Sequence, residues 1–476
     1  MVYRARRGSG VLALVTLLAA AAASTAEPAT PSFAGSWSGT LRLAGTSSPV
    51  GVALIVRGTR ATIDLGPGHP NRVEALARPS GGRLRLTVPG RPTPLRIELR
   101  RDGRAAVGTV RFGETTGSVR LRTGAAELGV YGTYRLGPTS LGVAPLGGNP
   151  FGVVYETGEV RRLHRTGPGA FALSSGLGVR LPASGTARFA RAGATWKGER
   201  ATRIAARQLE VQLVSRGAVL RGTLTIPPGP GPHPAVALVH GSGPTARSDV
   251  GVYAPFFVAR GLAVLAYDKR GIGLSGGAYQ GDLASASAID TYARDAEAAV
   301  RFLAAQPEVD KARVGLSGVS QAGWIMPLAA ARERAVRFLV LVSSPTVTQG
   351  ESDLYGSLTG QGARAADLAD AERRTRASGP SGFDPLPSIR QLTIPALWLF
   401  GELDHHVPTA LSRERLEPLV GAPGRDFTIE AFARGDHFLV HTSTGRSADV
   451  PRSSQFAEGL FTTIADWLAA RRLAAG

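Results

Sequence analysis

The chain has 476 residues, of which 55 are basic, 36 are acidic and 43% are hydrophobic. This hydrophobic fraction with modest charge excludes a disordered chain, and the length indicates two or three domains. Because the sequence contains no cysteine, disulfides, cysteine nucleophiles, thiolate zinc sites and iron–sulfur clusters are excluded.

The first 26 residues have the pattern of an export signal. Arg4, Arg6 and Arg7 give a positively charged start, and an apolar run follows at residues 11–23. Small residues come next, so cleavage is expected after Ala26. A membrane anchor is the alternative, but the apolar run is shorter than the roughly 20 residues that a bilayer span requires. We therefore expect an exported protein, either periplasmic or extracellular.

The next part of the chain is strongly basic and has a β pattern. Residues 27–205 carry a net charge of +15, whereas residues 206–476 carry +1. Alternation of apolar and polar residues, broken by Gly and Pro turns, predicts all-β modules. We place one module at 31–130 and a second at 131–205. The alternating runs lie at 50–56, 83–88, 95–99, 105–112 and 118–122.

Two features of this β region bear on its role. Residues 33–41, FAGSWSGTL, resemble the start of a lipocalin-like small barrel, and Trp37 as a core plug is the simpler interpretation. The charge of +15 suits contact with an anionic cell-envelope polymer, although an arginine-rich solvated surface explains the same composition. The sequence lacks interleaved aromatic and basic residues of the RNA-binding kind, so no nucleic-acid partner is expected.

From residue 206 onward, strand-like apolar runs alternate with helical segments. This pattern predicts a mostly parallel sheet covered on both faces, a doubly wound α/β domain. Residues 209–214 and 218–226 are expected as an antiparallel lead-in. The other strands are expected at 234–240, 262–268, 313–319, 337–342, 396–400 and 427–432, and the helices at 286–304, 321–332, 409–417 and 455–471.

The sharpest motif is GVSQA at residues 318–322, where a strand passes into a helix. Small residues two positions before and after Ser320 permit a tight turn that exposes its hydroxyl group. The helix that begins at Gln321 directs the positive end of its dipole at this turn. Ser317 is the alternative nucleophile, but Val319 at its +2 position would crowd the turn.

A serine nucleophile requires a base, and the base requires an acid that orients it. Asp404 follows the strand at 396–400, and His437 follows the strand at 427–432. Catalytic groups gather at the carboxyl ends of parallel strands, so these residues are expected to meet the serine in the order Ser, Asp, His. The alternatives are Glu402 as the acid, His405 or His406 as the base, and Asp436 as a residue that only shapes the turn.

A glycine-rich turn follows the strand at 234–240 and supplies a candidate oxyanion hole. Backbone N–H groups of the turn Gly241, Ser242 and Gly243, together with that of Gln321, are expected to face an acyl oxygen. His240 is expected to buttress the turn.

With these elements, residues 207–476 resemble the α/β-hydrolase family, in its exported esterase and serine-peptidase-like branch. The phrase YDKRGIGLSGG at 267–277 is similar to one in that branch, and we expect Asp268 and Arg270 to pair there. The resemblance implies acyl transfer to water through an acyl-enzyme, with no cofactor and no metal.

The segment 347–390 interrupts the sheet pattern and is expected to be a lid over the nucleophile. Its acyl contacts would be Leu354, Tyr355 and Leu358, and a surface insertion that touches nothing is the alternative. The resulting function hypothesis is an exported serine hydrolase of small carboxylic esters. A serine peptidase, of the aminopeptidase or prolyl-oligopeptidase-like kind, is the second hypothesis. A binding protein that docks through its basic β region is the third.

Overall fold

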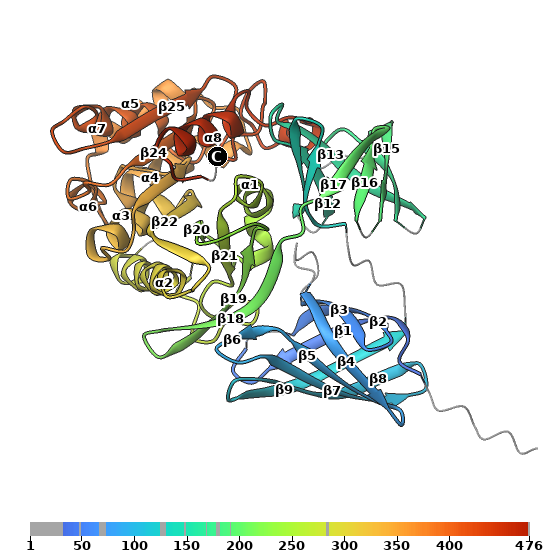
Figure 1. Cartoon of the computed structure of the whole chain (residues 1–476). Helices are drawn as coiled ribbons and strands as arrows, with labels where there is room; N and C mark the ends of the chain where they lie inside the picture. Colours follow the sequence, from blue (N-terminus) through green and yellow to red (C-terminus); the bar gives the residue numbers. More distant parts are fainter. Residues whose placement is uncertain are drawn as a thin grey trace, which may run out of the picture.

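The computed structural model describes residues 32–46, 49–65, 73–123, 130–146, 149–167, 169–177, 181–190, 192–281 and 285–474. The export signal expected at 1–26 lies outside these residues. Within the described chain there are two closed β-barrels and one nine-stranded sheet with helices (Figure 1). No helix in the described ranges combines the length and apolar character needed to cross a bilayer.

The first barrel forms because short alternating strands turn their apolar side chains inward. Trp37 is 1% exposed, and its indole N–H donates to the carbonyl of Phe33, so it fills the barrel interior as the sequence analysis expected. The last strand pairs with the first and closes the barrel. Its strands are β1 (Gly35–Leu43), β2 (Val50–Arg57), β3 (Arg60–Leu65), β4 (Val73–Ser80), β5 (Arg83–Val88), β7 (Leu95–Asp102), β8 (Ala105–Phe112) and β9 (Thr115–Thr123).

The second barrel repeats this plan in a shorter segment. Tyr134 and Trp196 lie in its core, and its first strand pairs with its last. Its strands are β10 (Gly132–Leu136), β11 (Thr139–Leu146), β12 (Asn149–Val154), β13 (Glu159–Gly167), β14 (Ala170–Ser174), β15 (Ala183–Phe189), β16 (Gly193–Trp196) and β17 (Glu199–Arg203).

The C-terminal sheet has the order β25-β24-β23-β22-β20-β21-β19-β18-β6. The six strands from β25 to β21 run parallel, and the hairpin of β18 and β19 is the antiparallel lead-in. The short β6 (Gly90–Arg91) comes from the first barrel and extends the sheet beside β18. The other strands are β18 (Arg207–Ser215), β19 (Ala218–Ile226), β20 (His233–Val239), β21 (Ala263–Tyr267), β22 (Val309–Val319), β23 (Phe338–Val342), β24 (Ala396–Gly401) and β25 (Phe427–Phe432).

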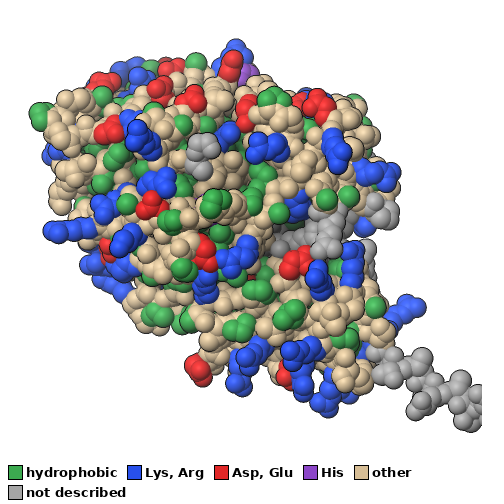
Figure 2. Space-filling view, in the orientation of Figure 1, with side chains coloured by type: hydrophobic (Ala, Val, Ile, Leu, Met, Phe, Trp, Pro, Cys, Tyr) green, Lys and Arg blue, Asp and Glu red, His purple; other side chains and the backbone are tan. Residues whose placement is uncertain are grey.

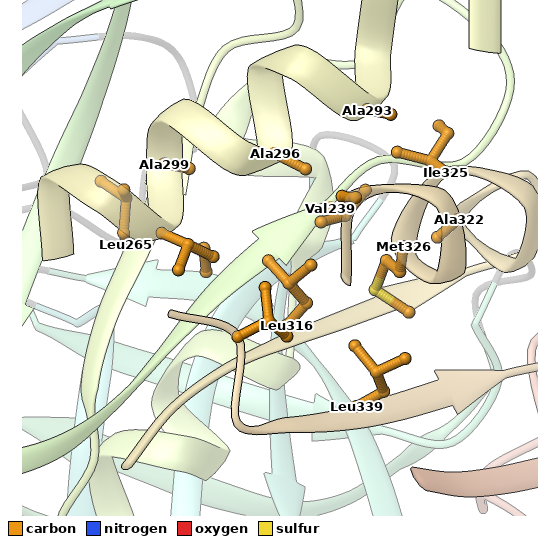
Figure 3. Packing of buried hydrophobic residues seen from close by; sticks show 14 of the residues in the cluster. Val239, Leu265, Ala293, Ala296, Ala299, Leu316, Ala322, Ile325, Met326 and Leu339 are labelled. Atoms are coloured by element: carbon orange, nitrogen blue, oxygen red, sulfur yellow. The ribbon is translucent and has the colours of Figure 1, made fainter. Parts of the chain in front are cut away.

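Helices cover both faces of this sheet, as continuous apolar strands require. One face packs against α2 and α3, and the other packs against α1 and α8. Figure 3 shows the first face, where Ala293, Ala296 and Ala299 of α2 allow a close approach to the strands. The helices are α1 (Tyr253–Ala259), α2 (Ala286–Ala304), α3 (Ala322–Arg332), α4 (Gln349–Thr359), α5 (Leu368–Ser378), α6 (Leu386–Ile389), α7 (Thr409–Leu416) and α8 (Leu460–Ala470).

The fold class expected from the sequence, an all-β region before a doubly wound α/β domain, is confirmed. Two details were wrong. The last helix begins at Leu460 rather than at residue 455, because residues 455–457 pair with backbone outside the helix. Asp268 pairs with the buried Arg247, and Arg270 pairs instead with Asp295 of α2. Arg247 donates to both oxygens of Asp268, and Arg270 donates to both oxygens of Asp295.

Candidate active site

Ser320 lies between the end of β22 and the start of α3, in a strained backbone conformation. Its φ is 61°, in the left-handed region that non-glycine residues avoid. The turn is closely packed, because a Cβ on Gly318 would lie 2.5 Å from the Cβ of Ala322 and 2.7 Å from the carbonyl of Val239. The predicted requirement for a small residue before Ser320 therefore has a direct steric cause.

Asp404 and His437 meet although they are far apart in sequence. His437 Nδ1 lies 2.8 Å from Asp404 Oδ2, and both side chains are buried. The other Asp404 oxygen accepts hydrogen bonds from the backbone N–H groups of His406 and Val407, at 2.6 and 2.9 Å. The loop after β24 therefore holds the carboxylate in one orientation toward the imidazole ring.

This environment changes the pKa of His437. Burial lowers the pKa, but the charge of Asp404, its hydrogen bond and the charge of Asp436 together outweigh burial. The pKa therefore lies above the usual value of 6.5. A ring nitrogen of raised basicity is suited to accept a proton.

The alternative acid and bases do not occupy equivalent positions. Glu402 has a 48% exposed side chain that lies 3.8 Å from Arg413, on the surface. His405 Nε2 lies 3.0 Å from the carbonyl of Thr444. His406 stacks on His437 with ring centroids 4.4 Å apart. Burial is the largest cause that lowers the pKa of His406 to about 4, and the nearby His437 lowers it further.

Asp436 shapes the turn beside the histidine. Its Oδ1 accepts hydrogen bonds from the backbone N–H groups of Phe438 and Val440, at 2.9 and 2.8 Å. Burial raises its pKa to about 6. These contacts fix the loop that carries His437 and agree with the turn-shaping interpretation.

Ser320 and His437 line the same cavity, whose volume is about 620 Å³. Small-molecule sites in proteins occupy roughly 300–1,000 Å³, so this cavity has the size of a substrate site. Within the described residues the two side chains share no hydrogen bond, and His437 bonds through Nδ1 alone. Such contacts often tighten only when substrate is bound.

The candidate oxyanion turn adjoins the serine. A Cβ on Gly241 would lie 3.1 Å from the carbonyl of Val319 and 3.5 Å from the Cβ of Ser320, so its backbone is close to the candidate nucleophile. Gly241 and Ser242 line the cavity, whereas Gly243 does not. Gln321 precedes the first residue of α3, next to Ser320.

Lys269 supports this turn, and it was not among the residues predicted from the sequence. Its ammonium group donates to the carbonyls of Gly241 and Gly243, at 2.8 and 3.1 Å, and to the side-chain oxygen of Gln321 at 3.3 Å. The side chain is 1% exposed. Lysine is rare in this sequence, which has three: Lys197, Lys269 and Lys311. This rarity is the one signal in the sequence that could have drawn attention to Lys269.

The segment 347–390 is helical and contributes Gln361 to the cavity lining. The expected acyl contacts Leu354, Tyr355 and Leu358 do not line the cavity. Tyr355 is buried instead, and its hydroxyl donates to the carbonyl of Asp404 at 2.8 Å. The insertion therefore holds the loop that carries Asp404. The cavity takes its apolar wall from Leu177, Val250, Val252, Tyr253, Val319, Phe438, Val440, Val450, Pro451 and Phe456.

Among the described residues, no group of three or more His, Asp and Glu side chains is arranged to hold a metal ion.

Comparisons with known proteins found similarity in the C-terminal domain. A family model described as serine aminopeptidase, S33, matches residues 230–366. A polyketide transferase, claH of Penicillium crustosum, is 31% identical over 133 residues, which are 28% of this chain and 41% of that protein. The chain thus matches less than half the length of this curated relative.

Several solved structures are similar to this part of the chain at low identity. The Pyrococcus furiosus esterase Pf2001 is 18% identical, with a TM-score of 0.39, over 57% of this chain and 92% of that one. Acetyl xylan esterase 1 from Thermoanaerobacterium sp. is 21% identical, with a TM-score of 0.37, over 49% and 78%. Est1E from Butyrivibrio proteoclasticus, with ferulic acid bound, is 15% identical, with a TM-score of 0.37, over 55% and 97%.

The sheet order, the turn at Ser320 and the family match agree on the fold. The C-terminal domain has the α/β-hydrolase fold, and its residues 230–366 match the model of the serine aminopeptidase family. The resemblance to the α/β-hydrolase family stated from the sequence is thereby confirmed over residues 230–366.

Proposed function

We propose that the protein is an exported serine hydrolase that cleaves carboxylic esters. The observation that carries the proposal is the shared cavity of Ser320 and His437, with His437 hydrogen-bonded to Asp404 at 2.8 Å. The strained φ of Ser320 supports it further, because such strain persists where it serves a function.

In the proposed reaction, the Ser320 hydroxyl attacks the acyl carbon while His437 Nε2 takes its proton. Asp404 stabilises the imidazolium ion that forms. The backbone N–H groups of Ser242 and Gln321 stabilise the negative oxygen. The alcohol then leaves with the proton from His437, and an acyl-enzyme remains. Water attacks this ester, His437 accepts the water's proton and returns it to Ser320 Oγ, and the carboxylic acid departs.

The test is labelling of the full chain with a fluorophosphonate, followed by mapping of the adduct. We expect the adduct on Ser320, and we expect Ser320→Ala to lower kcat on p-nitrophenyl esters by roughly 10⁴–10⁶, as loss of a triad serine does elsewhere. Ser317→Ala is the matched control, because Ser317 lines the same cavity within the strand. An adduct on Ser317, or near-normal turnover by Ser320→Ala, would refute the assignment.

A serine aminopeptidase is the second candidate, favoured by the description of the matching family and by an acidic group at the cavity. Asp249 is exposed and lines the cavity, where its carboxylate is suited to pair with a substrate amino group. Comparison of aminoacyl amides with acyl esters separates the two functions. Preferential amide cleavage that Asp249→Asn abolishes would support the aminopeptidase and overturn the esterase.

An accessory role for the first barrel is also proposed, as a contact with an anionic cell-envelope polymer. Its outer face carries exposed arginines on neighbouring strands, and Arg96 and Arg111 stand directly opposite each other. Like charges in that position destabilise a sheet, so a polyanion that neutralises them would be bound favourably. Figure 2 shows basic side chains over this barrel with fewer acidic ones between them. The test is retention of the full chain on an immobilised polyanion at low and high salt. Retention that stays the same when the salt concentration rises would count against this role.

A further inference from the structure

One wall of the cavity comes from outside the hydrolase domain. Leu177, which follows β14 of the second barrel, lines the cavity together with Val450, Pro451 and Phe456. These three belong to the stretch that precedes α8, which we call the strap, residues 450–457. The wall is apolar, and it is made by two parts of the chain that are more than 270 residues apart.

The strap is joined to the second barrel along its backbone. Glu159 and Gln455 form an antiparallel bridge between them. Gly158 allows the close approach, because a Cβ there would lie 3.3 Å from the carbonyl of Phe456. Five hydrogen bonds connect the two parts: Val160 N to Ser454 O at 2.8 Å, Phe456 N to Gly158 O at 2.9 Å, Leu177 N to Ser453 O at 3.1 Å, Gln455 Nε2 to Thr157 O at 3.1 Å, and Arg161 Nη1 to Ser454 O at 3.5 Å.

The other edge of the strap pairs with the loop that follows the catalytic histidine. The N–H of His441 donates to Gln455 at 2.9 Å, and the N–H of Ala457 donates to Leu439 at 2.7 Å. The strap therefore lies between the barrel and the loop of His437. A shift of the barrel would move both the cavity wall and the support of the histidine.

The barrel is also fixed directly to the rest of the cavity. Tyr155 is fully buried, and its hydroxyl donates to the carbonyl of Val252, a cavity residue, at 2.7 Å. Its ring lies 5.2 Å from that of Phe256 and 4.9 Å from that of Phe461, both on the hydrolase domain. These buried contacts join the barrel and the hydrolase domain into one packed unit. Figure 1 shows the two side by side.

From these contacts we infer that the second barrel completes an acyl-binding subsite, in which Leu177 determines specificity. The inference rests on the proposed function. An apolar wall in a cavity of about 620 Å³ selects esters with an apolar acyl group longer than acetyl. Discrimination in such pockets is roughly tenfold or more for each methylene group. Enlarging the side chain at position 177 shortens the subsite, and truncating it lengthens the subsite.

The experiment measures kcat/KM of the full chain on p-nitrophenyl esters from acetate to decanoate. We expect Leu177→Trp to lower the octanoate-to-acetate ratio of kcat/KM about tenfold or more. We expect Leu177→Ala to move the optimum toward longer chains. Leu76 is the matched control, because it is a leucine on the first barrel with 61% exposure. Leu76→Trp and Leu76→Ala should keep the wild-type profile.

The possible results separate this inference from the function on which it rests. Fluorophosphonate labelling of Ser320 in the wild type, with unchanged chain-length profiles in both Leu177 variants, overturns the subsite and leaves the hydrolase intact. A wild type that takes no label at Ser320 overturns both. If Leu177→Trp fails to fold, Leu177→Ala decides, because truncation of a half-buried side chain leaves the barrel packing in place.

Discussion

Lys269→Met tests how the oxyanion turn is held. The ammonium group of Lys269 donates to the carbonyls of Gly241 and Gly243 and to the side chain of Gln321. Methionine has a similar length but no donor. The substitution therefore removes three hydrogen bonds while nearly keeping the packing volume.

The expected effect on stability and catalysis follows from these contacts. Lys269 is 1% exposed, whereas Gly241 and Gly243 are partly buried, so water can reach their carbonyls more readily than the buried side-chain oxygen of Gln321. A buried acceptor left unsatisfied costs about 1–3 kcal/mol, so we expect a loss of about that size in the free energy of unfolding. The turn at Gly241 then loses its fixed orientation. A misplaced oxyanion donor costs about 2.7–4 kcal/mol of transition-state stabilisation, or a factor of 10²–10³ in kcat.

Two measurements check this prediction: denaturant unfolding, and kcat and KM on p-nitrophenyl acetate. A positioning role predicts that kcat falls at 10 °C, where the variant is still folded, with little change in KM. Lys311→Met is the control, because Lys311 is exposed at the start of β22 and should change neither quantity. Wild-type kcat in folded Lys269→Met would refute the positioning role.

Two further predictions concern buried charges. Asp404→Asn removes the charge that raises the pKa of His437, so the rise of kcat/KM with pH should move to lower pH and kcat should fall by about 10⁴; rate profiles from pH 5 to 9 check both. Arg247→Met leaves two carboxylates buried without their partner and should lower the free energy of unfolding by about 3–5 kcal/mol in denaturant titrations. Arg373→Met, whose side chain is 68% exposed, should change it by less than about 0.5 kcal/mol.

The direction in which kcat/KM changes with pH depends on the proposed role of His437 as the base. His437 must be neutral to accept a proton, so activity is present above its pKa and is lost as pH falls through it. A profile of Asp404→Asn that rises at the wild-type pH would show that Asp404 does not set this pKa. An Arg247→Met variant as stable as the wild type would show that the buried carboxylates find other partners.

The strands of the C-terminal sheet could be predicted because each is a short apolar run between turn residues. Ser320 could be located for the same reason, since a tight turn between strand and helix depends on neighbours in sequence. The sequence pattern favoured Asp404 over Glu402, and the fold supplies the physical reason. Both residues follow β24, and only the loop conformation turns Asp404 inward and leaves Glu402 on the surface.

Contacts between distant segments left no local pattern to interpret. Asp268 and Arg270 are close in sequence, yet the partner of Asp268 is Arg247, on a turn that follows a different strand. Leu177 lies in a β module with no catalytic motif, and it reaches the cavity because the barrel docks against the strap. Such positions become visible only when the domains are packed together.

The two barrels support different loops of the same candidate site. The second barrel holds the strap and, through it, the loop of His437. The first barrel encloses Leu274, which belongs to the loop that also carries Lys269. The N–H of Leu274 donates to Asp268, so this loop is fixed at both the barrel and the sheet. Since Lys269 holds the turn at Gly241 and Gly243, one barrel braces the loop of the proposed base and the other braces the proposed oxyanion donors. A hydrolase domain expressed without residues 32–205 would therefore lose both supports, although Ser320, Asp404 and His437 would all remain in its sequence.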